Sequence, residues 1–156
     1  MSISGLFTLL GAPLANNRWS WGSQRASDGA VFLRVWQDLK FDKDGRIHML
    51  VCPAVTHSDE ESENLGFQER VRHTESIRSG KPCFMVMCLA KDVEDPKRTI
   101  LDFDDRDIFI GGDIIETPKD FQFPPKTSDR ARFLARNGAT WVQLAGRKPV
   151  SSIKPA

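Results

Sequence analysis

The chain has 156 residues, the length of one domain with a hydrophobic core. Hydrophobic residues make up 40% of the sequence and charged residues 28%, so the composition excludes transmembrane, fibrous and disordered proteins. Because 22 Lys and Arg residues face 21 Asp and Glu residues, the formal net charge is only +1. A nucleic-acid partner would therefore need a local basic patch rather than a strong overall field.

The cysteines and the N-terminal segment indicate the compartment. Cys52, Cys83 and Cys88 lie in or beside apolar runs, and no spacing of Cys and His residues is typical of a metal site. The first residues are apolar but lack the basic start and the long apolar stretch of a secretory signal. We therefore expect reduced thiols, no cofactor, no membrane segment and a cytoplasmic location.

In chain order, the first clear element is a β-hairpin within residues 30–54. Two β-rich runs flank Asp44-Gly45, a dipeptide that favours the positive φ angles of a tight turn. Side chains alternate along a strand, so the first run should have one core face and one amphipathic face. The core face holds Val31, Leu33 and Val35, and the amphipathic face holds Phe32, Arg34, Trp36 and Asp38.

A helix and a central strand are expected next. The acidic residues after Pro53 predict a loop, and residues 64–79 predict a helix with Gly80 at its C-cap. The apolar stripe of this helix holds Phe67, Val71 and Ile77, and its basic surface holds Arg70, Arg72, His73 and Arg78. Residues 83–90 are apolar on both faces of a pleated strand, which favours the middle of a sheet.

The remaining residues predict short strands and one more helix. Segments 99–103, 107–111 and 113–117 are β-rich, and Thr127 or Ser128 can cap a helix that ends at Gly138. Residues 140–146 predict the last strand, with a polar tail from about residue 147. Residues 1–156 thus form one α+β domain, expected as a small curved antiparallel or mixed β-barrel with flanking helices.

The densest functional signal is the segment from Asn16 to Arg25. Trp19 and Trp21 lie two positions apart among amide, hydroxyl, glycine and arginine residues. Indoles stack on bases, and amides and hydroxyls can read base edges, so this pattern indicates a base-binding loop. The alternative is that both Trp side chains cap an open end of the barrel.

Trp36 and Asp38 follow the first hairpin strand and suggest a second part of that pocket. A carboxylate can accept hydrogen bonds from the exocyclic amino group of an extruded cytosine or adenine. Asp38 could equally cap a turn.

An acidic run offers a different function. It contains Asp102, Asp104, Asp105, Asp107, Asp113 and Glu116. Carboxylates at strand ends can hold Mg²⁺ in a nuclease, but the run lacks an E-x-K motif and an EF-hand pattern, so solvated turns are the simpler interpretation. His48, His57 and His73 are scattered and have no evident Ser or Cys nucleophile beside them.

Positive charge gathers at several places. These are Arg70, Arg72 and Arg78, then Arg130, Arg132 and Arg136, and finally Arg147 with Lys148. Cations on one face can bind phosphates, whereas the alternative is that each cluster is an ordinary solvated surface. Their combination with the Trp-rich loop favours a nucleic-acid reader.

Three segments carry a family resemblance: RWSWG at 18–22, VFLRVWQDL at 31–39 and residues 68–90. Across roughly residues 8–146 the chain resembles the PUA-like superfamily, and within it the EVE, YTH, ASCH and SRA-like group that reads modified bases. It is most similar to the reader modules that are attached to modification-dependent restriction endonucleases. The resemblance implies a pseudo-barrel, an aromatic cage around an extruded base, and basic loops on the backbone. The chain differs from these readers because it has no tyrosine, no usual EVE opening motif and no nuclease domain within the 156 residues.

By this resemblance the protein is a module that binds a methylated cytosine or adenine, in DNA rather than RNA, and works with a separate nuclease or effector. The expected base-binding residues are Asn17, Trp19, Ser20, Trp21, Trp36 and Asp38. The expected backbone contacts are Arg18, Arg25, Arg70, Arg72, Arg130, Arg132 and Arg136. The alternatives are a small metal-dependent nuclease that uses the carboxylates from Asp102 to Glu116, and a protein-interaction domain.

Overall fold

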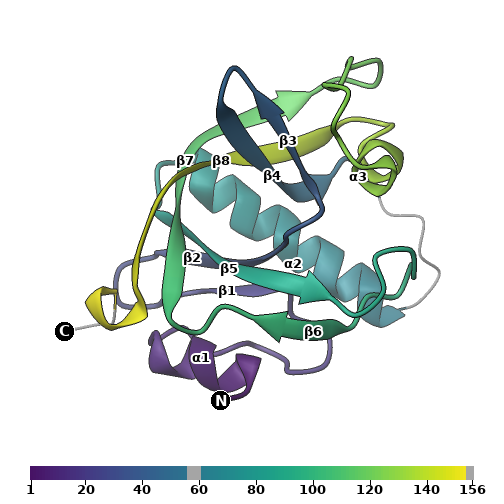
Figure 1. The fold of residues 1–156 in the computed structure, drawn as a ribbon. Coiled ribbons are helices and arrows are strands. Elements are labelled where there is room, and N and C mark those ends of the chain that lie inside the picture. The colour runs from purple at the N-terminus through teal and green to yellow at the C-terminus, as the bar shows by residue number, and fades with distance from the viewer. Residues whose placement is uncertain (56–60, 154–156) are drawn as a thin grey trace.

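The structure is a computed structural model that describes residues 1–55 and 61–153. In order, the elements are α1 (Ile3–Leu9), β1 (Gly22–Gln24), β2 (Val31–Trp36), β3 (Lys40–Lys43), β4 (Arg46–Pro53), α2 (Glu61–Arg78), β5 (Cys83–Ala90), β6 (Ile100–Phe103), β7 (Asp107–Thr117), α3 (Asp129–Leu134), β8 (Ala139–Pro149) and a 3₁₀ turn (Val150–Ser152). Figure 1 shows α2 crossing one face of the curved sheet, with α1 and α3 at opposite ends of the molecule. The predicted α+β class is confirmed.

The sheet has eight strands and is mixed. Its order is β1-β2-β5-β7-β8-β4-β3, and β6 pairs with β5. β2 and β5 run parallel, and the other pairs of described strands are antiparallel. The order is an open path with β1 and β3 at its ends, so the prediction of a closed barrel is wrong for the strands that the structure describes.

The hairpin turn is confirmed, although one of its strands differs from the prediction. Asp44 and Gly45 have φ angles of 57° and 75°, and they join β3 to β4. The apolar run before them forms the separate strand β2, which pairs with β1 and β5. Both faces of β2 are buried, because Leu33 belongs to one core cluster and Phe32 to another. On the expected amphipathic face, Phe32 is buried in the core, whereas Arg34 and Trp36 are half-buried.

Helix α2 is confirmed, and Gly80 with φ 106° follows its end, but its inward face differs from the prediction. Its buried residues are Gly66, Glu69, Arg70, His73, Thr74 and Ile77, whereas Val71 is exposed. Arg70 and His73, which were expected on the solvated surface, therefore point inward. The physical reason is that backbone carbonyls of the neighbouring segments need donors, which an arginine supplies.

For the elements after α2, the predicted type, helix or strand, is confirmed more often than the predicted length. β5 is central, with β2 on one side and β7 on the other. The two segments expected around Gly111 form the single strand β7, whose register shifts at Gly111. A Cβ atom on Gly111 would lie 2.9 Å from the Cβ of Cys83, so glycine allows this close approach between strands. Of the two predicted N-cap residues, Thr127 and Ser128, Ser128 caps α3, and its hydroxyl accepts a 3.1 Å hydrogen bond from the Ala131 amide.

Both ends of the chain contribute to the core. The unpredicted helix α1 buries Leu6 and Phe7, and Val150 and Ile153 pack in the same core cluster. The prediction of a polar tail is therefore wrong for residues 147–153, because β8 extends to Pro149 and the following turn is partly buried. The three cysteines are buried and free, as expected. Among the described residues, no helix combines the length and apolar character needed to cross a membrane.

Candidate functional site

The Trp-rich segment forms a turn that its own hydrogen bonds hold. The Asn16 side-chain oxygen accepts from the Arg18 and Trp19 amides at 2.8 and 3.3 Å. The Ser20 amide donates to the Asn16 carbonyl at 3.0 Å. Asn17 and Arg18 are exposed and Trp19 is half-buried, so the turn presents only part of the expected set to solvent.

Ser20 and Trp21 attach this turn to α2. Ser20 is 2% exposed, and its hydroxyl donates a 3.0 Å hydrogen bond to the Glu69 carboxylate. The Trp21 indole lies on Gly66, where a Cβ atom would approach its nitrogen to 2.4 Å. Burial raises the pKa of Glu69, while the Ser20 hydroxyl opposes that rise. These contacts give both predicted base-binding side chains a structural role between the turn and the helix.

Arg70 lies beneath the same turn and joins three segments. It is 4% exposed and donates to the carbonyl oxygens of Val51, Trp21 and Arg34 at 2.6, 2.8 and 2.9 Å. Burial lowers its pKa to about 10, so the guanidinium remains charged at neutral pH. The prediction that Arg70 contacts a nucleic-acid backbone is wrong, because its donors are directed at carbonyl groups inside the protein.

Arg25 is a second internal arginine. It is 7% exposed, donates to the Leu10 and Ile153 carbonyls at 2.9 and 2.8 Å, and pairs with Asp28. It therefore connects the two ends of the chain, and the prediction of a backbone contact is wrong for Arg25 as well.

Asp38 has an arginine partner that the sequence analysis missed. Arg98 donates to both carboxylate oxygens, with a distance of 2.6 Å between Nη2 and Oδ2. The same guanidinium lies 5.3 Å from the ring centroid of Trp36, which also packs against two core clusters. Residues 38 and 98 are sixty positions apart, so no local pattern signals this pair. Asp38 and Arg98 thus form an ion pair beside the Trp36 ring, at the end of β2.

A cleft lies between α2 and the ends of β4, β7 and β8, and has a volume of about 350 Å³. Its lining includes Cys52, Val71, Thr74, Arg78, Glu116, Lys119, Asn137 and Thr140. None of the predicted base-binding residues, and no aromatic side chain, is among the described residues that line it. The structure therefore does not combine the Trp-rich turn with this cleft.

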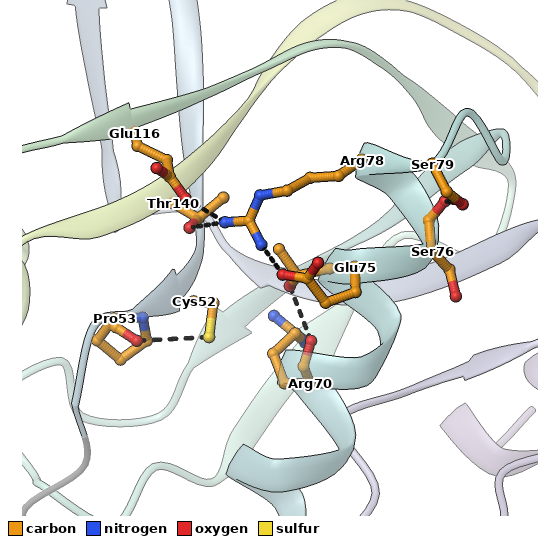
Figure 2. A network of polar contacts seen from close by, with 10 residues as sticks. Cys52, Pro53, Arg70, Glu75, Ser76, Arg78, Ser79, Glu116 and Thr140 are labelled. Atoms are coloured by element: carbon orange, nitrogen blue, oxygen red, sulfur yellow. Dashed lines mark hydrogen bonds and ion pairs between the residues drawn. The ribbon is translucent and has the colours of Figure 1, made fainter.

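Arg78 is the central polar group of the cleft. Its guanidinium donates to Glu75 on α2, to Glu116 on β7, and at 3.0 Å to the Thr140 hydroxyl on β8 (Figure 2). Glu116 and Thr140 face each other across the β7–β8 pair, so one helical side chain bridges two strands. A guanidinium and a carboxylate thus lie side by side on the cleft wall. In the sequence, Arg78 and Glu116 belong to two separate charge clusters, one basic and one acidic.

Helix α3 ends at Leu134, and the chain after it reaches the cleft at Asn137 and Gly138, which line it. On this helix, Phe133 is 51% exposed, and the guanidinium carbons of Arg136 and Arg130 lie 3.9 and 5.5 Å from its ring centroid. Arg132 instead donates to the Thr127 and Pro124 carbonyls at 3.2 and 2.7 Å. Of the three arginines predicted here, Arg130 and Arg136 accompany an exposed aromatic ring, and Arg132 supports the preceding loop.

The acidic run has ordinary structural partners. Asp104 accepts from the amides of Arg106 and Asp107, both at 2.9 Å, and Glu116 pairs with Arg78. Among the described residues, no group of three or more His, Cys, Asp or Glu side chains could hold a metal ion. His48 and His73 are buried, and His57 lies outside the described residues.

The arrangement offers a polar cleft and, beside it, an exposed basic and aromatic surface on α3. Arg72, which directly follows the lining residue Val71 on α2, is exposed. Comparisons of the chain with protein-family models, with curated proteins and with solved structures found no match.

Proposed function

We propose that this protein is a nucleic-acid-binding module that receives an extruded base in the cleft between α2 and the β7–β8 pair. The observation that carries the proposal is the guanidinium of Arg78 beside the carboxylate of Glu116 on one cleft wall. A volume of about 350 Å³ is at the lower end of the range of small-ligand pockets, about 300–1,000 Å³.

The pair matches the chemistry of a base edge. Cytosine and adenine each carry an amino donor next to a ring-nitrogen acceptor, and extruded bases are read by hydrogen bonds to such edges. Glu116 can accept from the amino group while Arg78 donates to the ring nitrogen. Val71 and Cys52 supply apolar surface in the same cleft, where a base ring or a methyl group can pack.

Cations near the opening support a polyanionic ligand. Lys119 lines the cleft, the exposed Arg72 directly follows the lining residue Val71, and Arg136 directly precedes the lining residue Asn137. These groups provide local positive charge although the net charge of the chain is only +1. The resemblance of residues 18–22, 31–39 and 68–90 to PUA-like base readers supports the same class of ligand.

The test compares two variants that remove carboxylates bonded to the same arginine. Glu116→Gln changes the cleft wall, whereas Glu75→Gln changes an Arg78 partner that is absent from the cleft lining. Anisotropy titrations use labelled duplexes of one sequence carrying cytosine, 5-methylcytosine, adenine or N6-methyladenine at the central position, at one salt concentration.

We expect wild-type protein to prefer one duplex and Glu116→Gln to reduce that preference by about 1–3 kcal/mol, while Glu75→Gln keeps it. Melting temperatures of both variants establish that they are folded. Equal binding of all four duplexes by wild-type protein, or an unchanged preference in Glu116→Gln, would contradict a base site in this cleft.

A further inference from the structure

We propose that Phe133, with Arg130 and Arg136, forms a stacking platform for an unpaired base of single-stranded DNA next to the cleft. This inference rests on the proposed function only in taking nucleic acid as the ligand. The platform on α3 would contact a different nucleotide of the DNA from the one that enters the cleft.

The exposure of Phe133 is the first observation. Its side chain is 51% exposed although it lies on a helix that buries Ala131 in the core. A large aromatic ring in water gains free energy when another flat group covers it. Every base has such a flat face, so the ring can stack on a strand with little regard to sequence.

The two arginines define the chemistry of the partner. Arg136 places its guanidinium carbon 3.9 Å from the ring centroid, where it occupies the ring face as a stacked base would. Arg130 lies 5.5 Å from the same centroid. A base that replaces the Arg136 guanidinium leaves this long side chain free to bind the adjacent phosphate. Aromatic rings flanked by arginines suit single strands, whose bases are free to stack.

The excess of positive charge on α3 favours a polyanion as the partner over an apolar protein surface. Residues 128–137 carry Arg130, Arg132 and Arg136 against the single carboxylate of Asp129, and Glu94 of the β5–β6 connection also lies against the helix, where its carbonyl accepts from Arg130. Arg132 donates to two backbone carbonyls of the preceding loop. Arg130 donates to the Glu94 carbonyl and Arg136 to the Phe133 carbonyl at 2.6 Å, and the guanidinium groups of these two arginines lie at the ring.

The platform is joined to the cleft wall by a short stretch of chain. Arg136 is followed directly by Asn137 and Gly138, which line the cleft. A strand whose extruded base enters the cleft therefore passes α3 with a neighbouring nucleotide. Phe133 is placed to hold that nucleotide once the duplex has opened.

The experiment measures affinity for a labelled single-stranded 12-mer of mixed sequence by anisotropy. Phe133→Ala and Phe133→Leu should weaken binding by roughly 5- to 150-fold, because both remove the π face, and Phe133→Tyr should bind like wild type. Leu101→Ala is the matched control, since Leu101 is 65% exposed on β6, and it should bind normally.

The outcomes separate this platform from the base site. Normal binding by folded Phe133→Ala or Phe133→Leu would overturn the platform, as would an equal loss in Leu101→Ala. A loss in the Phe133 variants with no effect of Glu116→Gln on base preference would support the platform and contradict the base site. Wild-type protein that binds no single-stranded DNA would overturn the platform, whatever its preference among duplexes.

Discussion

The Ser20 hydroxyl donates a 3.0 Å hydrogen bond to the Glu69 carboxylate, and this bond connects the Trp-rich turn to the inward face of α2. The other carboxylate oxygen, Oε1, is buried without a partner among the described residues. A carboxylate that has lost part of its hydration depends strongly on the donors it retains. The bond thus explains why a serine stands between two tryptophans.

Removal of this donor should destabilise the fold without changing DNA affinity. Ser20→Ala leaves Glu69 with fewer donors and should lower the free energy of unfolding by about 1–3 kcal/mol. Urea unfolding measures the loss, and an anisotropy titration tests binding. A variant that keeps its stability but loses DNA binding would restore the Trp-rich turn as the base site.

Arg70 should be among the residues on which stability depends most. Arg70→Ala leaves the carbonyls of Val51, Trp21 and Arg34 without this donor, and each buried unpaired group costs about 1–3 kcal/mol. Arg72→Ala, on the exposed side of the same helix, should change stability by less than about 0.5 kcal/mol. Similar unfolding midpoints for the two variants would contradict the internal role of Arg70.

His73 should make the protein less stable in mild acid. Burial, together with the positive charges of Arg70 and Arg72, lowers its pKa from 6.5 to about 4. The folded state therefore favours neutral imidazole, and this preference stabilises the fold fully above pH 6.5. The stabilisation is lost as the pH falls from 6.5 to about 4, because the unfolded chain binds the proton more readily.

The loss attributable to His73 should be on the order of 2 kcal/mol. His73→Gln cannot titrate, so the difference in unfolding free energy between wild type and this variant should shrink as the pH falls from 7.5 to 4. Urea unfolding at several pH values gives this difference and cancels the contributions of other groups, such as Glu69. A difference that is constant with pH would contradict the prediction.

Asp38→Asn should weaken the fold rather than alter base preference. The substitution removes the negative charge that pairs with Arg98 and should cost about 1.5–3 kcal/mol, the range for hydrogen bonds to charged groups. The ratio of affinities for modified and unmodified duplexes should stay at the wild-type value. A changed ratio in a folded variant would instead favour direct base recognition by Asp38.

The salt dependence of binding should distinguish two arginines of α3. Arg136→Ala removes an exposed cation and should reduce the slope of log affinity against log salt by about 1. Arg132→Ala should leave the slope unchanged, since Arg132 is half-buried and donates from Nε and Nη2 to the Thr127 and Pro124 carbonyls. Arg136 is exposed and donates to one carbonyl, that of Phe133, at 2.6 Å. Equal slopes for Arg136→Ala and wild type would place α3 outside the interface.

The sequence by itself determined those features that depend on neighbouring residues. Asp44-Gly45 predicts the hairpin because few other dipeptides adopt two positive φ angles, and both residues have them. Ser128 predicts the start of α3 because its hydroxyl meets an amide three residues later. The apolar run at 83–90 predicts a central strand because a strand covered on both faces needs no polar side.

Only the tertiary structure decided which charged and aromatic side chains are buried. Arg70 and Arg72 are equivalent in local sequence, yet one reaches carbonyls of distant segments and the other faces solvent. Asp38 finds Arg98 sixty positions away, and Arg78 meets Glu116 across the β7–β8 pair. Phe133, in an ordinary amphipathic pattern, remains exposed. Such pairings depend on chain topology, because the free energy of a buried charge is set by the groups that surround it in space.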